Sequence, residues 1–111
     1  MTETVQTIRG DKFQDEVVNS TTPVLVDFYA DWCGPCKVMD PVIHSLSKEY
    51  QGRVKFVKID TDVNQEIAMQ FGIMSIPTMM FFSKGKVEDI LIGAVPAAVL
   101  KTKVEALSTT A

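Results

Sequence analysis

The sequence of 111 residues predicts an α/β fold, in which a central mixed β-sheet of four to five strands carries helices on both faces. Two observations predict it. Short apolar runs of strand length alternate along the chain with longer segments of helical periodicity. The last two such runs are separated only by a short turn, which makes that pair antiparallel, whereas strands joined through a helix run parallel. No linker or repeat divides residues 1–111, so we expect a single domain.

The first elements expected are a strand around residues 5–8 and a helix over residues 11–19. Asp11 stands where a helix cap is favoured, and Phe13 and Val17 are one helical turn apart. We therefore expect a helix here that Asp11 can cap.

The centre of the fold is expected in the next two elements. Residues 23–30 are an apolar run without alternation, which predicts a strand buried on both faces. A helix is expected from Cys33 to about Tyr50, kinked by Pro41. The remaining expected elements are a strand over 54–59, a helix over 63–71 ended by Gly72, a hairpin of strands 78–82 and 87–92, and a last helix that opens near Pro96.

Charge and composition exclude several classes of partner. The chain has 11 Lys and Arg against 14 Asp and Glu, a net charge of −3, which argues against nucleic acid or an anionic membrane. The N-terminal residues contain neither a basic region nor an apolar core, so we expect no signal peptide and a cytoplasmic location.

The only two cysteines, Cys33 and Cys36, have a spacing that normally indicates redox chemistry or metal binding. A structural metal site needs four ligands. The single histidine, His44, follows Cys33 on the same predicted helix at roughly 16 Å, given a rise of about 1.5 Å per residue. That is too far to share an ion, so we expect no metal.

Redox chemistry explains more of the local sequence. Gly34 and Pro35 separate the cysteines, and the pair falls where a strand passes into a helix. Unpaired N–H groups and the helix dipole stabilise a thiolate there and lower its pKa. Cys33 is nearer the helix mouth and is expected to attack, whereas Cys36 is expected to resolve the mixed disulfide.

The segment Trp32–Lys37 resembles the active-site motif of the thioredoxin family, WCGPC followed by lysine. Further matching segments, in the same order along nearly the whole chain, are Val26-Asp27-Phe28, Lys58-Ile59-Asp60, Ile76-Pro77-Thr78 and Gly93-Ala94. The resemblance implies the thioredoxin fold and a protein-disulfide reductase whose electrons are carried by a redox-active Cys33–Cys36 disulfide, with no other cofactor.

Two charged residues acquire expected roles from the resemblance. Asp27 lies in an otherwise apolar strand and, taken alone, could reach solvent at a bulge; the resemblance instead implies that it assists proton transfer at Cys36. Lys58, taken alone, is a lysine at the surface end of a strand. The resemblance implies that it is a secondary site residue and the partner of Asp27.

The resemblance also implies a surface that binds protein substrates. Pro77 would follow a cis peptide bond, and the backbone at Ile76 would pair with an extended substrate segment. Ile73 and Met74 would extend an apolar rim around Cys33. The implied substrate-binding residues are Trp32, Gly34, Pro35, Ile76, Pro77, Gly93 and Ala94.

The implied partners are disulfide-containing target proteins and a separate thioredoxin reductase, dependent on a flavin or an iron–sulfur centre. We expect a monomer that binds neither nucleic acid nor membrane. Two alternatives remain: the same fold acting as an oxidant or isomerase, and a module that binds proteins without redox chemistry. Oxidants and isomerases of the family usually carry a histidine between the cysteines, whereas this chain has Gly-Pro.

Four positions depart from the family pattern or border its variable part. Tyr29 stands where many members have a second tryptophan, Asp40 replaces a small apolar residue, and Ser75 replaces a frequent glycine. Ser75 and Met74 border the implied substrate surface, so these changes bear on the choice of partner. We expect Asp40 on the solvated face of its helix.

Overall fold

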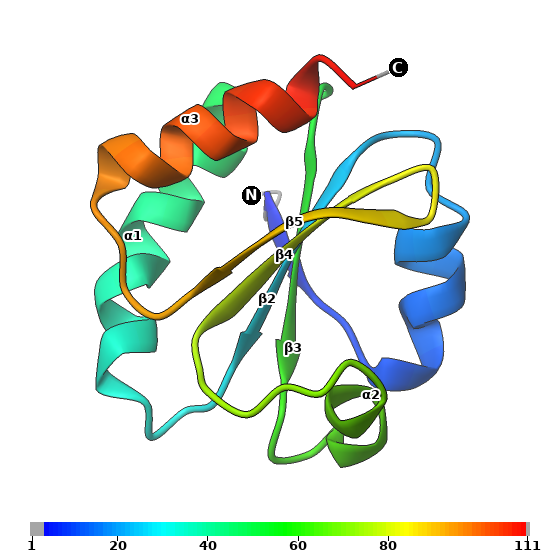
Figure 1. Ribbon diagram of the computed structural model, residues 1–111, viewed down its shortest axis with the longest axis vertical. Helices are drawn as coiled ribbons and strands as arrows, with labels where there is room; N and C mark the ends of the chain where they lie inside the picture. The colour runs from blue at the N-terminus through cyan, green and yellow to red at the C-terminus, as the bar shows by residue number, and fades with distance from the viewer. Residues whose placement is uncertain (1–3, 111) are drawn as a thin grey trace.

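A computed structural model describes residues 4–110, which form a five-stranded mixed sheet with helices on both faces (Figure 1). The strand order is β1-β3-β2-β4-β5; the first three strands are mutually parallel, and β4 and β5 are antiparallel to their neighbours. This is the predicted fold class. The strands are β1 (Val5–Thr7), β2 (Val24–Tyr29), β3 (Lys55–Asp60), β4 (Thr78–Ser83) and β5 (Lys86–Ile92).

The helices lie in two layers. Helices α1 and α3 cover one face of the sheet, and the short helices η1, η2 and α2 lie on the other side (Figure 1). Within the described residues, no helix is long and apolar enough to span a bilayer. The helices are η1 (Gly10–Lys12), η2 (Gln14–Val18), α1 (Gly34–Glu49), α2 (Gln65–Gln70) and α3 (Ala97–Ser108).

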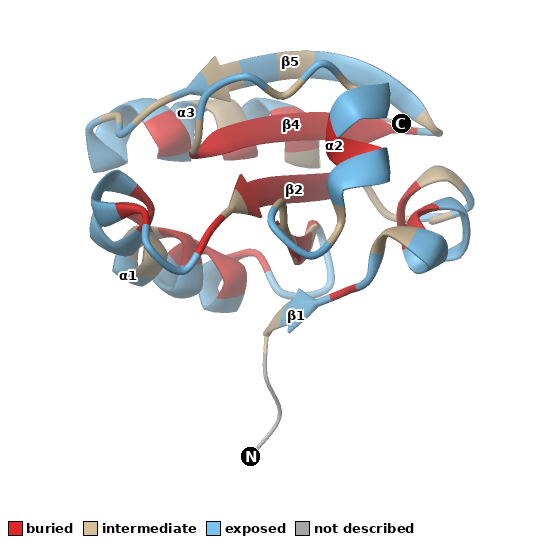
Figure 2. Cartoon of the chain, turned by 90° about the horizontal axis from the view of Figure 1, so that it is seen from below, coloured by how far each residue is buried: buried red, intermediate tan, exposed pale blue. Residues whose placement is uncertain are grey.

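Strand β2 separates two hydrophobic cores because its alternate side chains point to opposite faces. Leu25 packs with the side chains of α1 and α3, whereas Val24 and Val26 pack with η2 and α2. All three are buried, and in Figure 2 both β2 and β4 are buried along most of their length. The prediction of a central strand buried on both faces is therefore confirmed, and Asp27 must face the same layer as Leu25.

The segment expected as one helix over 11–19 differs from the prediction. It is a 3-10 turn, η1, followed by a π-helical segment, η2, and Asp11 makes no cap. Asp11 instead pairs with Arg9 at 3.2 Å, and the N–H of Gly10 donates to Oδ1 of Asn64 at 2.8 Å. The start of the helix is thus satisfied from the loop before α2. Phe13 and Val17 are both buried.

The predicted hairpin between β4 and β5 is confirmed. Its two-residue turn consists of Lys84 and Gly85, with φ of 53° and 77°. Both residues adopt the left-handed conformation that a type I′ turn requires, and this turn matches the twist of the flanking strands. The hairpin places β5 at the edge of the sheet, next to the loop that contains Gly93.

Candidate active site

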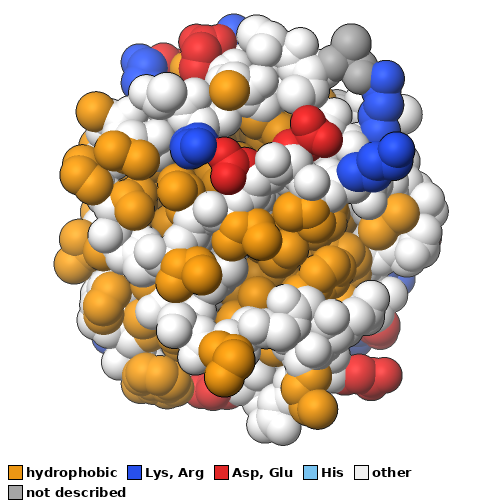
Figure 3. All heavy atoms as spheres, in the orientation of Figure 1, with side chains coloured by type: hydrophobic (Ala, Val, Ile, Leu, Met, Phe, Trp, Pro, Cys, Tyr) orange, Lys and Arg blue, Asp and Glu red, His pale blue; other side chains and the backbone are white. Residues whose placement is uncertain are grey.

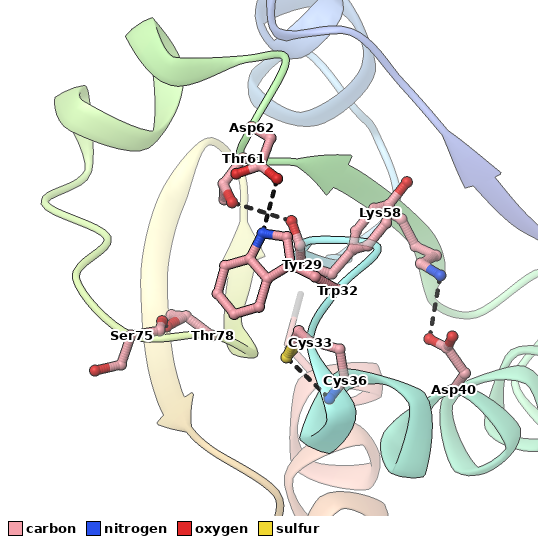
Figure 4. The surroundings of a disulfide bond; sticks show 10 residues. All are labelled: Tyr29, Trp32, Cys33, Cys36, Asp40, Lys58, Thr61, Asp62, Ser75 and Thr78. Carbon is pink, nitrogen blue, oxygen red and sulfur yellow. Dashed lines mark hydrogen bonds and ion pairs between the residues drawn. A yellow bond between two sulfur atoms is a disulfide. The ribbon is translucent and has the colours of Figure 1, made fainter.

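Cys33 and Cys36 form a disulfide at the point where the loop after β2 enters α1, with their Cα atoms 5.3 Å apart (Figure 4). Cys33 is the N-cap residue of α1, and Cys36 lies in its first turn. Both residues are 2% exposed, so exposure does not distinguish them. Their position along the helix does distinguish them, because the N-cap residue Cys33 lies beside the backbone N–H groups that have no partner within the helix.

The first turn of α1 is built to hold negative charge on Cys33. Its Sγ accepts a hydrogen bond from the backbone N–H of Cys36 at 3.2 Å. Pro35 occupies one of the first two helix positions, where a missing N–H costs nothing. After reduction, the same N–H and the dipole of this 16-residue helix would stabilise a Cys33 thiolate.

A second loop closes the site opposite the disulfide. The Ile76–Pro77 peptide bond is cis, as the resemblance implied, and the carbonyl of Pro77 accepts the N–H of Gly93 at 2.8 Å. Ile76 packs against the small cluster that contains both cysteines and Ala30. The loop before β4 and the loop after β5 are therefore fixed to one another beside the disulfide.

Gly93→Ala is expected to destabilise the protein by about 1–2 kcal/mol, because Gly93 has φ of +86°, which a Cβ atom disfavours. The new Cβ would meet no atom within 4 Å, so the cost comes from the backbone and not from a clash. Urea unfolding of the oxidised protein measures it. Gly34→Ala is the matched control: its Cβ also meets open space, but Gly34 has ordinary helical backbone. Equal losses in both variants would contradict this explanation.

The apolar side chains predicted to form a rim around Cys33 differ in exposure. Trp32 is 70% and Met74 is 94% exposed, while Ile73 and Ile76 are half-buried. In Figure 3 hydrophobic side chains extend over β5 and the connection that leads into β4. Of the predicted substrate-binding residues, Pro77 is buried, Gly93 is half-buried, and Gly34, Pro35 and Ala94 are exposed. Substrate binding by these residues stays a prediction.

Trp32 is held by a contact that the sequence did not indicate. Its indole N–H donates to Oδ2 of Asp62, in the loop after β3, at 2.8 Å (Figure 4). The N–H of Asp62 in turn donates to Oδ1 of Asp60 at 2.9 Å. The exposed indole ring is thus fixed in place beside the disulfide.

Asp27 is a buried carboxyl without a hydrogen-bond partner. It is 1% exposed, which excludes the interpretation that it reaches solvent at a bulge. Among the described residues, neither of its oxygens has a partner. Burial raises the pKa of Asp27 to about 7; the charge of Lys58 lowers this pKa, and the charge of Asp40 raises it. Near neutral pH the group can therefore both hold and release a proton.

The expected pairing of Lys58 with Asp27 is wrong. The Lys58 ammonium donates to Oδ1 of Asp40 at 3.1 Å, and it lies 4.3 Å from the centre of the Tyr29 ring (Figure 4). Asp40 is therefore not simply on a solvated face, since its side chain reaches from α1 to β3. Sequence reasoning noted Asp40 and Tyr29 only as departures from the family pattern. Nothing in the sequence indicated that both would meet Lys58.

The site contains no metal-binding cluster among residues 4–110: no three His, Cys, Asp or Glu side chains come together there. His44, the only histidine, is exposed on α1. The candidate reactive groups of the site are the sulfur atoms of Cys33 and Cys36 and the buried carboxyl group of Asp27.

A disulfide at a helix N-terminus, faced by a cis proline on a mixed sheet, defines a thiol–disulfide oxidoreductase. Residues 4–106 match the thioredoxin family model. The chain belongs to the thioredoxin family, and it is a thiol–disulfide oxidoreductase, as the sequence predicted.

Relatives with high identity cover most of this chain. It is 48% identical over 101 residues to the chloroplastic M-type thioredoxin of Pisum sativum, covering 91% of this chain and 59% of the relative. It is 47% identical to thioredoxin 1 of Nostoc sp. over 84% of this chain and 87% of the relative. It is also 47% identical to a thioredoxin of Porphyra purpurea, over 88% of this chain and 92% of the relative. The chain thus spans about three fifths of the pea relative and most of the other two.

Proposed function

We propose that this protein reduces disulfides in target proteins through two successive exchanges at Cys33 and Cys36. The thiolate of Cys33 attacks one sulfur of the target disulfide, which forms a mixed disulfide and releases the other target sulfur as a thiolate. Cys36 then loses its proton and attacks the sulfur of Cys33. This step forms the Cys33–Cys36 disulfide and releases the second target thiolate. The two released thiolates take up protons, so the target gains two electrons and two protons.

The observation that carries this proposal is the position of the cysteines at the N-terminus of α1. The N–H of Cys36, which donates to Sγ of Cys33, supports negative charge on the attacking sulfur. Cys36 lies on the buried side of the helix. Cys36 therefore remains a free thiol while the target is bonded to Cys33.

Asp27 is the proposed proton acceptor for Cys36. Its strand position places it on the face of β2 that α1 covers, the face that also carries Leu25. A base works best when its pKa lies close to the working pH, and the pKa of Asp27 is raised to about 7. Without this acceptor, Cys36 would have to release its proton into an apolar cluster.

The proposed partners are proteins that offer an extended segment beside a disulfide. The apolar surface around Trp32 and Met74 would bind such a segment, and its backbone would pair with the chain at Ile76. A separate flavin- or iron–sulfur-dependent reductase would restore the dithiol. We place the protein in the cytoplasm as a monomer without nucleic-acid or membrane partners, since its net charge is −3 and the chemistry requires a reducing compartment.

The reduction potential of the Cys33–Cys36 pair tests the direction of the chemistry. Equilibration with glutathione or dithiothreitol buffers, read by mass spectrometry after thiol trapping, is expected to give about −270 mV, the value typical of thioredoxins. A value above about −180 mV would identify an oxidant or isomerase instead. A Cys33→Ser, Cys36→Ser double variant that keeps its biological effect would identify a binding module.

A further inference from the structure

The ammonium group of Lys58 is held at two points. Oδ1 of Asp40 accepts its hydrogen bond at 3.1 Å, and the Tyr29 ring lies beneath it at 4.3 Å (Figure 4). The Lys58 side chain is only 21% exposed, so bulk water screens the pair less than at an open surface. Two residues from different elements, α1 and β2, therefore fix the position of one cation.

Asp27 and Lys58 are direct neighbours in the parallel register of β2 and β3. Side chains at paired positions lie on the same face of a sheet. Even so, both oxygens of Asp27 are unpartnered among the described residues, and Lys58 makes its ion pair with Asp40. The Lys58 ammonium therefore pairs with a carboxylate on the helix and not with the carboxyl group beside it in the sheet.

Few other charged groups face Asp27. On β4 its partner in the register is Met79, which does not titrate. On β2 the next residue on the same face is Tyr29. The charged residues of α3 bind elsewhere: Lys101 to Glu49, Lys103 to Asp89 and Glu105 to Tyr50. Burial is the largest influence on the pKa of Asp27, and the charged groups that act on it are Lys58 from β3 and Asp40 from α1.

We propose that Asp40 is a positioning residue that, with the ring of Tyr29, holds the Lys58 ammonium away from Asp27 and so keeps Asp27 able to accept a proton at neutral pH. The catalytic consequence rests on the proposed function, in which Asp27 takes the proton of Cys36. The electrostatic part does not, because it concerns only these side chains. Without Asp40, Lys58 would be free to turn toward the Asp27 carboxylate, its neighbour in the register of β2 and β3, and Asp27 would become a weaker base.

The experiment is a titration of the Asp27 carboxyl carbon by NMR in the oxidised protein, with aspartate labelled by carbon-13. Asp40→Ala is expected to lower the Asp27 midpoint by about one pH unit or more, because a freed cation within a few ångströms favours the carboxylate. Lys58→Met is expected to raise it. In the Asp40→Ala, Lys58→Met double variant the midpoint should lie only slightly below that of Lys58→Met, because the direct effect of the Asp40 charge on Asp27 is smaller than that of Lys58.

Two controls separate the explanations. Glu49→Ala removes a carboxylate from the same helix, one that pairs with Lys101, and is expected to leave the Asp27 midpoint in place. An unchanged midpoint in Asp40→Ala would overturn the proposal. So would an equal fall with and without Lys58, since that pattern would mean direct repulsion between Asp40 and Asp27.

The kinetics distinguish failure of this inference from failure of the proposed function. If Asp27 accepts the proton of Cys36, the pH profile of mixed-disulfide resolution in Asp40→Ala shifts to lower pH with the NMR midpoint. A midpoint that moves while Asp27→Asn leaves resolution unchanged would refute the role of Asp27 but keep that of Asp40. If Asp27→Asn resolves slowly but the Asp27 midpoint is the same in wild type and Asp40→Ala, the role of Asp27 is kept and that of Asp40 is refuted.

Discussion

Asp27→Asn is expected to stabilise the oxidised protein by about 4 kcal/mol at pH 8 and to change its stability little at pH 4. The substitution keeps the size and shape of the side chain but removes its ability to ionise. Asp27 is buried, and neither of its oxygens has a hydrogen-bond partner among the described residues. A charge at this position therefore costs free energy that a neutral amide does not.

The pH dependence follows from the two pKa values of this carboxyl group. The pKa is raised from 3.8 to about 7 in the folded protein, chiefly by burial. Well below pH 3.8 the group is protonated in both the folded and the unfolded chain. As the pH rises, the unfolded chain loses this proton first, so unfolding becomes progressively more favourable. Above about pH 7 both states are ionised, and the full cost of the buried charge remains.

Urea unfolding at pH 4, 6 and 8 measures this effect in wild type and Asp27→Asn. The stability difference should grow from pH 4 to pH 8. Asp15→Asn, which changes an exposed carboxyl on η2, is the control and should alter stability by less than about 0.5 kcal/mol at each pH. Parallel stability curves for wild type and Asp27→Asn would mean that the carboxyl ionises without penalty.

Most of the fold could be predicted because it depends on patterns within single segments. The largely apolar run that forms β2, and the turn at Lys84 and Gly85, each carry a local physical signal. The helix expected over 11–19 was predicted less well. Its first turn is satisfied by Asn64, a residue far away in the sequence, and no local pattern at Asp11 reveals that hydrogen bond.

For the site, too, the features that depend on local sequence could be predicted and the contacts between distant segments could not. Cys33 and Cys36 could be assigned from their spacing and from the strand-to-helix transition, and the structure joins them as a disulfide. The partners of Trp32 and Lys58 could not be assigned. Asp62 and Asp40 come from other elements, and which carboxylate a flexible cation meets depends on how those elements pack. Hydrogen bonds and ion pairs between side chains of different elements are therefore the part of the site that the sequence predicts least well.

Cys36→Ser is expected to stop exchange after the first step. The reduced variant should form a mixed disulfide between Cys33 and a disulfide-containing target protein, up to one adduct per chain, and turnover should fall to the uncatalysed background. Serine preserves the size of the buried side chain at position 36. Its hydroxyl is a poor nucleophile toward sulfur, so the adduct has no internal route to release.

Cys33→Ser is expected to behave differently, with neither turnover nor a stable adduct. The remaining thiol at Cys36 lies within the first turn on the buried side of α1, and it has lost its partner at the cap position. Non-reducing electrophoresis and mass spectrometry of both reduced variants distinguish the two outcomes, with the Cys33→Ser, Cys36→Ser variant as the background. An adduct that accumulates in Cys33→Ser but not in Cys36→Ser would reverse the order of attack. In that case the helix N-terminus would activate Cys36. The structure indicates the opposite, because Sγ of Cys33 accepts the hydrogen bond from the N–H of Cys36.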